Sequence, residues 1–334
     1  MILNYKLSAM QTDTSKKIIA YLSQNKAATA KVLIDYLELS PQAVFRQLKT
    51  LINNRQITKS GLPPRVFYSI KTASPLIRES IASARLKKII DENYLLITSG
   101  GDILRGLEGF GYWCQKNSLT LAKTAAEYAA TLKKYQAFRK GGLIDGMSKM
   151  RATFPQVFVD EMYYLDFYSL ERFGKTKLGA LLLYAKQSQN RQLMKELYEI
   201  IKNNVRKLIK NKKIDAVGFI PPTVSRKLQF QKEMERMLAL SLPRINIIKA
   251  RGQIVVPQKT LSRLADRVEN VASTIFIGGS AACRNVLLID DAVGSGATFN
   301  ETAKKIKEKG LCSGRIIGLA ITGSFKGFDV LSEI

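Results

Sequence analysis

The sequence predicts an α/β protein with a doubly wound parallel sheet in its C-terminal half and a separate, smaller N-terminal domain. From about residue 161, helix and strand patterns alternate, which is the order that builds a parallel sheet. Residues 1–71 instead show short amphipathic helices followed by paired strand patterns. Residues 72–160 are mostly helical in pattern. We therefore predict three domains, with boundaries at 1–71, 72–160 and 161–334.

Composition restricts the chemistry and the partners. The 334 residues include 53 Lys and Arg, 27 Asp and Glu and no His, for a formal net charge of +26. Such a charge attracts polyanions, although a generally basic proteome would also produce it. Without His, no Ser-His-Asp triad, His-ligated zinc or imidazole acid–base step can operate.

The cellular compartment is predicted from the cysteine spacing, the length of the apolar runs and the order of the first residues. The cysteines Cys114, Cys283 and Cys312 are too widely spaced for a disulfide framework or a metal pair. No apolar run reaches membrane-spanning length, and the first residues lack the order of a signal peptide. We expect a cytoplasmic protein with no membrane partner.

The N-terminal domain is predicted from its helix spacing and caps. Apolar residues indicate helices over 13–24, 29–37 and 41–53, and Ser40 and Pro41 are typical of a helix start. Strand patterns at 57–59 and 65–70 flank a Gly-Leu-Pro-Pro turn and predict a hairpin. The third helix is expected to place Val44, Leu48 and Leu51 inward, and its polar residues outward: Gln42, Arg46, Gln47 and Lys49.

Three helices followed by a hairpin resemble the winged-helix DNA-binding domains of small bacterial repressors. The resemblance implies a winged helix-turn-helix whose third helix enters the major groove of DNA. It also implies which residues face DNA: Ser40, Gln42, Arg46, Lys49, Lys59 and Arg65. Winged helices also serve in dimerisation or RNA binding, so these alternatives, a homodimer included, stay open.

Residues 72–160, the predicted helical connector between the two other domains, are less informative. Helices are expected near 75–91 and 118–139, with a glycine- and aromatic-rich run, Leu95–Trp113, between them. Such a run forms core and turns or, less often, stacks on bases. The sequence does not decide whether the connector bridges the domains or holds a dimer together.

Residues 286–298 carry the most information about function. The apolar run 286–289 predicts a buried strand, followed by Asp290 and Asp291 and by a loop of small residues, 294–298, that opens a helix ending near Lys309. Loop amides and a helix N-terminus hold phosphate, and paired carboxylates accept hydrogen bonds from ribose hydroxyls. The alternative is a strand that ends in a solvated acidic turn before a capped helix.

The remaining elements of the C-terminal domain follow from the same patterns. Helices are expected over 191–210 and 229–240, with strands over 214–220, 245–249 and 315–322. A long irregular stretch, 251–283, precedes the acidic pair.

The 286–298 run resembles the phosphoribosyl-pyrophosphate (PRPP) motif of type I phosphoribosyltransferases, and about 164–334 resembles their ComF-like, amidophosphoribosyltransferase-related branch. Residues outside the motif also match in order: Pro221-Pro222, Gln258, Leu261, Arg267, Asn270 and Phe276. The resemblance implies a type I phosphoribosyltransferase fold that binds PRPP or a nucleotide together with Mg²⁺. No direct metal ligand is implied beyond Asp290 and Asp291.

The resemblance also implies residue roles. Asp290, Asp291 and Arg267 would serve catalysis, and the 5′-phosphate would lie on Gly294, Ser295, Gly296, Ala297 and Thr298. Pyrophosphate contacts would come from the turn Pro222, Thr223, Val224, Ser225 and Arg226. A mobile hood over 251–276 would contribute Gln258, Arg263 and Asn270.

Two departures from the family keep three functions open. An Arg-Gly-Phe-Asn-Gln block of the family is replaced by Lys227-Leu228-Gln229-Phe230-Gln231, and a winged helix stands in place of the usual zinc module. The protein is predicted to be a phosphoribosyltransferase associated with nucleic acid. The alternatives are a PRPP- or nucleotide-sensing transcriptional regulator without turnover, and an effector of a retron-type antiphage defence system.

Overall fold

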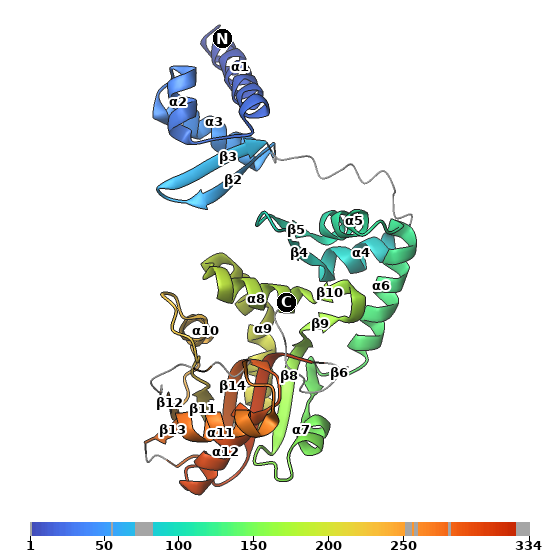
Figure 1. The fold of residues 1–334 in the computed structure, drawn as a ribbon, viewed down its shortest axis with the longest axis vertical. Coiled ribbons are helices and arrows are strands. Elements are labelled where there is room, and N and C mark those ends of the chain that lie inside the picture. Colours follow the sequence, from blue (N-terminus) through green and yellow to red (C-terminus); the bar gives the residue numbers. More distant parts are fainter. Residues whose placement is uncertain are drawn as a thin grey trace. The chain divides into compact units, whose positions relative to one another are not determined.

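The computed structural model describes residues 2–54, 56–70, 83–250, 256, 260–279 and 282–324, with side chains from Asp13 onward except that of Leu62. The chain divides into two compact units (Figure 1). The first comprises the described residues of Met1–Ser80 together with Ile97–Ile103 and Gly111–Ser118. The second comprises those of Ile81–Leu96, Leu104–Phe110 and Leu119–Ile334.

The N-terminal part of the first unit contains the predicted helices and hairpin. Its elements are α1 (Ile2–Asn25), β1 (Ala27–Ala28), α2 (Ala30–Leu37), α3 (Pro41–Asn53), β2 (Ile57–Leu62) and β3 (Arg65–Ile70). The strands pair antiparallel in the order β1-β3-β2. Side-chain caps start two helices, because Thr29 Oγ1 accepts the Val32 N–H and Ser40 Oγ accepts the Ala43 N–H. Strand β1 was not predicted, and α1 begins earlier than expected.

The core of this part lies between the helices and the sheet. Its largest buried members are Ile18, Leu22, Leu33, Val44, Leu48, Leu51, Ile57 and Tyr68. The inward positions predicted for α3 are confirmed, but Gln47 was wrongly placed on the outer face. Its Oε1 accepts a hydrogen bond of 2.8 Å from Ser15 Oγ, because α1 packs along that side of α3.

The predicted connector contains short strands as well as helices. Its elements are α4 (Ala84–Asn93), β4 (Leu95–Ile97), β5 (Ile103–Arg105), α5 (Gly106–Lys116), α6 (Leu121–Gln136), β6 (Arg139–Lys140), β7 (Leu143–Asp145) and α7 (Met147–Thr153). The early part of the helix expected near 75–91 lies outside the described residues. Phe110 is fully buried, 5.1 Å from the ring of Tyr94 and 5.3 Å from that of Tyr128. For Phe110, therefore, the aromatic run is core.

A largely parallel sheet forms the centre of the second unit. Its strand order is β11-β14-β15-β8-β7-β6, with β8 at Glu161–Phe167, β11 at Ala216–Phe219, β14 at Val286–Val293 and β15 at Ile316–Gly323. The first four strands are parallel, and β7 and β6 add an antiparallel edge. This mixed α/β architecture agrees with the predicted fold class. The sheet also reaches into residues 139–145, which were expected to belong to the connector.

Helices connect the parallel strands in opposite directions across the sheet. The connection from β8 to β11 contains β9 (Ser169–Leu170), a 3₁₀ turn (Glu171–Phe173), β10 (Gly174–Lys175), α8 (Lys177–Ser188) and α9 (Arg191–Lys212). Helix α12 (Ala297–Glu308) connects β14 to the neighbouring β15. Because such crossovers are right-handed, the two connections cover opposite faces. They begin at the carboxyl ends of β8 and β14, and open α/β sheets bind ligands at this end of their strands.

The region between β11 and β14 is more regular than predicted. It contains α10 (Phe230–Leu238), β12 (Asn246–Lys249), α11 (Leu264–Thr274) and β13 (Ile275–Gly278), and β12 pairs antiparallel with β13. Residues 264–278, expected to be irregular, therefore form a helix and a strand. Among the described residues, no helix combines the length and the apolar character that crossing a bilayer requires.

Candidate active site

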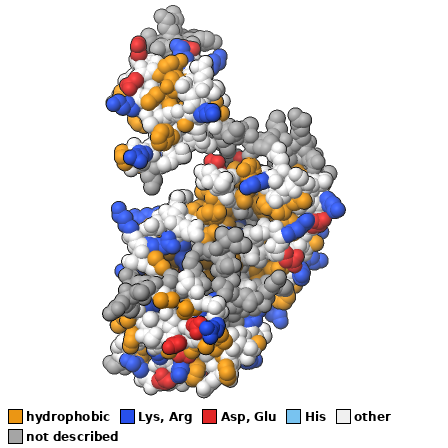
Figure 2. Space-filling view, in the orientation of Figure 1, with side chains coloured by type: hydrophobic (Ala, Val, Ile, Leu, Met, Phe, Trp, Pro, Cys, Tyr) orange, Lys and Arg blue, Asp and Glu red, His pale blue; other side chains and the backbone are white. Residues whose placement is uncertain are grey.

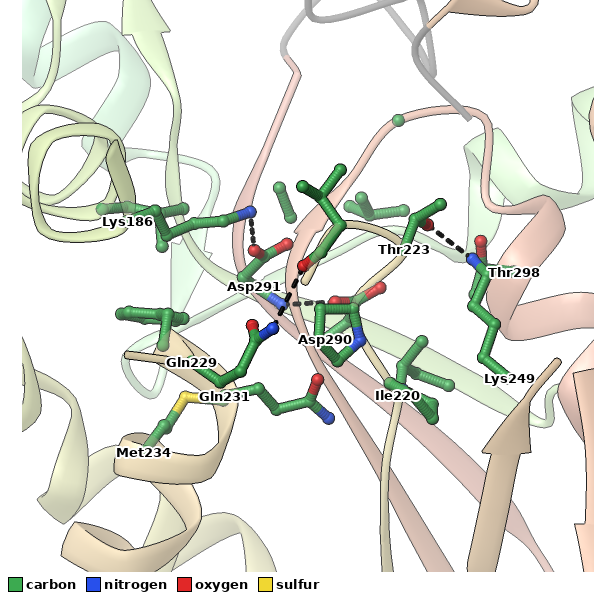
Figure 3. A pocket seen from close by; sticks show the side chains of 18 of the residues that line it. Lys186, Ile220, Thr223, Gln229, Gln231, Met234, Lys249, Asp290, Asp291 and Thr298 are labelled. Atoms are coloured by element: carbon green, nitrogen blue, oxygen red, sulfur yellow. Dashed lines mark hydrogen bonds and ion pairs between the residues drawn. The ribbon is translucent and has the colours of Figure 1, made fainter. Parts of the chain in front are cut away.

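The two acids lie within strand β14, at its carboxyl end. The strand pairs with β11 as far as Ile289, and with β15 as far as Val293. The strand therefore continues through Asp290 and Asp291, which we had expected to follow it. Because β11 stops earlier, one edge of β14 is free beside the acids, and both side chains reach a single pocket (Figure 3).

The electrostatics of Asp290 and Asp291 are determined mainly by burial and by repulsion between the two like charges. The Asp291 N–H donates to Asp290 Oδ1 at 2.7 Å, and the Asp291 carboxylate forms an ion pair with Lys186 of α8 (Figure 3). The pKa of Asp290 is raised well above its usual value, first by burial and then by the charge of Asp291, and Lys186 and Lys249 oppose this shift. Burial likewise lowers the pKa of Lys249. A ligand that donates hydrogen bonds to these carboxylates would stabilise their charged forms.

The loop after the acids begins α12 through two glycines with different roles. Gly296 is the N-cap, with a left-handed φ of 84°, and a Cβ there would lie 2.5 Å from Met150 Sδ. At Gly294 the nearest atom to such a Cβ is Arg267 Nη1, at 3.9 Å. Glycine is thus required by the fold at 296, whereas at 294 it leaves room in the pocket. The amides of the loop and of the first turn of α12 form the end of the helix that attracts anions.

Replacing each glycine with Ala separates these roles. We expect Gly296→Ala to lower the free energy of unfolding by about 1–3 kcal/mol, because of the left-handed backbone and the clash with Met150. Gly294→Ala should change it by less than about 0.5 kcal/mol, since its Cβ meets nothing closer than 3.9 Å. Denaturant unfolding of both variants tests this. Equal losses in the two would contradict the loop conformation.

The turn after β11 forms a second wall. Thr223 Oγ1 accepts a 2.7 Å hydrogen bond from Lys249 Nζ, and Gln229 Nε2 donates to the Val224 carbonyl at 3.2 Å (Figure 3). Pro222 and Arg226 also line the pocket, whereas Ser225 is exposed and does not. Four of the five predicted pyrophosphate contacts therefore face the same space as the acids. The pocket has a volume of about 310 Å³, which is in the range of small-molecule sites.

Of the expected catalytic and hood residues on α11, only Arg267 reaches the pocket. Its side chain is 6% exposed, its Nε donates to the Leu261 carbonyl at 2.8 Å, and burial lowers its pKa. Arg263 precedes the first helical turn and is exposed, and Asn270 does not line the pocket either. The predicted hood residue Gln258 lies outside the described residues.

The structure thus brings together most of the predicted pocket residues. The lining includes Asp290, Asp291, Arg267, Gly294, Ser295, Gly296, Thr298, Pro222, Thr223, Val224 and Arg226. Ala297 is buried and does not line the pocket. Sequence reasoning assigned no site role to several other lining residues: Tyr168, Lys186, Gln187, Gln229, Gln231 and Lys249. Gln229 and Gln231 belong to the block that departs from the family, which was a usable signal, whereas Lys186 and Lys249 had none.

On α3, the residues expected to face DNA are exposed. Ser40 caps the helix, and Gln42, Arg46 and Lys49 are accessible on its outer side. Lys59 on β2 and Arg65 on β3 are also exposed. Phe45, which was not singled out, is 51% exposed and shares the helix face of Gln42, Arg46 and Lys49 by its spacing. Figure 2 shows further Lys and Arg side chains on the visible surface of both units.

No protein-family model matches this chain, and no curated protein matches it. A solved structure of adenine phosphoribosyltransferase is similar to 40% of this chain and to 72% of its own, with 14% identity and a TM-score of 0.25. This is a weak likeness of fold, and the interpretation of the pocket rests on its own residues.

Proposed function

We propose that the second unit is a type I phosphoribosyltransferase-like module of the ComF-like branch, which binds PRPP or a nucleotide. The observation that supports this is the convergence of three anion- and sugar-binding features in one pocket. They are the acids Asp290 and Asp291, the glycine loop at the start of α12, and the 222–226 turn beside Arg267. The acids and the 222–226 turn belong to β14 and to the end of β11, which are neighbours in the sheet but lie about seventy residues apart in the chain.

The proposed ligand position follows from the donors and acceptors. The 5′-phosphate would lie on the amides between Gly294 and Thr298, where the N-terminus of α12 adds a positive potential. The ribose hydroxyls would donate to Asp290 and Asp291. The pyrophosphate would extend toward Arg226, Arg267 and Lys249, three of the cations that line the pocket.

Magnesium fits this site only together with its ligand. Among the described residues, no cluster of three or more His, Cys, Asp or Glu side chains is placed to hold a metal ion. Mg²⁺ is commonly held by one or two carboxylates plus the phosphates of a substrate, and Asp290 and Asp291 suit that role. When bound, Mg²⁺ would neutralise part of the pyrophosphate charge.

In phosphoribosyl transfer, the bond between ribose C1 and pyrophosphate breaks, and an acceptor nitrogen forms the new bond to C1. The chain's own residues would position the two reactants and offset the charge that moves between them. Asp290 and Asp291 would lie beside a ribose that becomes cation-like. Arg226, Arg267 and Lys249 would hold the departing pyrophosphate.

A second candidate is a sensor that binds PRPP or a nucleotide without turnover. Two observations favour it: Asp291 is already ion-paired to Lys186, and Leu228 and its neighbours replace the family's Arg-Gly-Phe-Asn-Gln block. In both candidates the N-terminal unit is proposed to be a winged-helix domain that binds DNA.

Calorimetric titration with PRPP and Mg²⁺ tests the pocket, and an assay for released pyrophosphate with a panel of nucleobases tests turnover. Binding with pyrophosphate release would support the enzyme. Binding without release for any base would support the sensor. Absence of binding by PRPP and by nucleoside monophosphates would refute both.

A further inference from the structure

The exposed side of α9 is strongly basic. Between Lys202 and Lys213 the chain has six Lys or Arg residues and no Asp or Glu. Lys202 is paired with Glu199 and Lys212 with Glu161. Within the described part of the chain, no carboxylate lies within ion-pair distance of the other four cations, all of which are exposed: Arg206, Lys207, Lys210 and Lys213.

The helix presents these cations in a fixed row. Arg206 and Lys210 follow an i, i+4 spacing, which places them on one stripe of the helix about 6 Å apart. Lys213 follows directly as the left-handed C-cap of α9. The opposite face of α9 is held in the core by Leu193, Leu197, Ile201, Val205 and Leu208. Because that face is buried, the basic stripe cannot rotate away from solvent.

The basic surface continues past the end of α9 to the amino-terminal edge of the sheet. Asn285 Nδ2 donates to the carbonyls of Lys212 and Lys213, at 3.3 and 3.0 Å, and so holds the start of β14 against the end of the helix. The neighbouring Arg284 is exposed, and its backbone N–H donates at 3.0 Å to Asp215 Oδ2, so this carboxylate adds one negative charge at the same edge. Glu161 is the shared partner of Lys212 and Arg315, at 2.5 and 2.8 Å, so it balances only one of these two positive charges.

We propose that this basic face, defined as Arg206, Lys207, Lys210, Lys213 and Arg284, binds the phosphate backbone of a nucleic acid. It lies at the amino end of β14, whereas the acid pair lies at the carboxyl end, so it is separate from the pocket. A row of unneutralised cations with interspersed polar groups such as Asn203 and Asn211 suits phosphate contacts, which carry no sequence information.

The distribution of exposed apolar side chains on α9 argues against an anionic membrane or a protein as the partner of this basic face. A helix that binds an anionic membrane inserts an apolar face, but the apolar face of α9 is in the protein core. A protein partner would require an apolar or aromatic centre. Among the described side chains of α9, Ile200, at 42%, is the only large apolar one that is strongly exposed.

The test uses the full chain and a fluorescently labelled duplex, with binding measured by anisotropy over a range of salt concentrations. The variant is Arg206→Gln, Lys210→Gln and Lys213→Gln combined. We expect it to lower the slope of log affinity against log salt by about 3 and to weaken binding about 10- to 100-fold at moderate salt. The matched control removes three exposed cations from α4 and α6: Lys87→Gln, Lys123→Gln and Lys133→Gln.

Further controls separate folding from binding. The charge-conserving variant Arg206→Lys, Lys210→Arg, Lys213→Arg should bind like the parent, and thermal unfolding should show that all variants are folded. Equal losses in the α9 variant and its control, an unchanged α9 variant, or a parent that does not bind nucleic acid would each overturn the proposal. So would a preference for anionic vesicles that the α9 substitutions abolish. Titration with PRPP is independent of these results, because α9 does not line the pocket.

Discussion

Asp290→Asn is expected to weaken PRPP binding about 10- to 100-fold and, at the same time, to stabilise the ligand-free protein. Binding weakens because a carboxylate that accepts hydrogen bonds from ribose is replaced by a neutral amide. Stability rises because burial and the neighbouring Asp291 disfavour the charged form of Asp290, as its raised pKa indicates. The free energy of unfolding at neutral pH should therefore be higher in the Asn variant than in the parent.

The pH dependence has a definite sign. With its pKa raised by folding, Asp290 holds a proton in the folded protein at pH values where the unfolded chain has lost it. More protons are then bound in the folded state, so this residue lowers stability as pH rises from its ordinary value, 3.8, through its raised value. The advantage of the Asn variant should therefore be present at neutral pH and vanish as the pH falls toward about 4.

Thermal unfolding across pH and calorimetric titration with PRPP measure both effects. Asp266→Asn is a suitable control, because it makes the same change on the surface of α11, where the carboxylate is not part of the pocket lining. An Asp290→Asn variant that is less stable than the parent at neutral pH would contradict the electrostatic description. One that binds PRPP as well as the parent would contradict the proposed sugar position.

The second large effect is expected on the DNA binding that we propose for α3. Replacing Gln42, Arg46 and Lys49 together with Ala should weaken specific binding at least about 100-fold, since each base contact contributes about 1–3 kcal/mol. Specific duplexes can be selected from a random pool by repeated binding to the parent protein. Lys16→Ala, at an exposed cation on α1, is the control for general loss of charge.

The Phe45→Ala variant tests base recognition separately from the effect of charge. An exposed aromatic side chain on a helix in the major groove can contact a thymine methyl, so this variant should lose preference at one base position. It should leave the salt dependence unchanged, since no phosphate contact is removed. If selection enriches no sequence, or if the α3 variant binds the selected duplex like the parent, the proposed role of this helix is wrong.

The local elements were predictable because their causes lie within a few residues of one another. The N-caps Thr29 and Ser40, the inward apolar positions of α3 and the small residues before α12 all act over a single turn. The same is true of the candidate sugar site, because Asp290, Asp291 and the glycine loop are consecutive in the chain. These parts of the protein follow from sequence alone.

Other features depend on which segments meet, and only the tertiary structure decided them. Lys186 reaches Asp291 because the crossover brings α8 to the carboxyl end of β14, more than a hundred positions along the chain. Gln47 is buried because α1 lies against α3, and β6 and β7 belong to the sheet because their hydrogen bonds are completed by β8. Backbone caps and glycine conformations are set by nearby atoms, whereas burial and charge pairing depend on packing between distant segments, which no local pattern records.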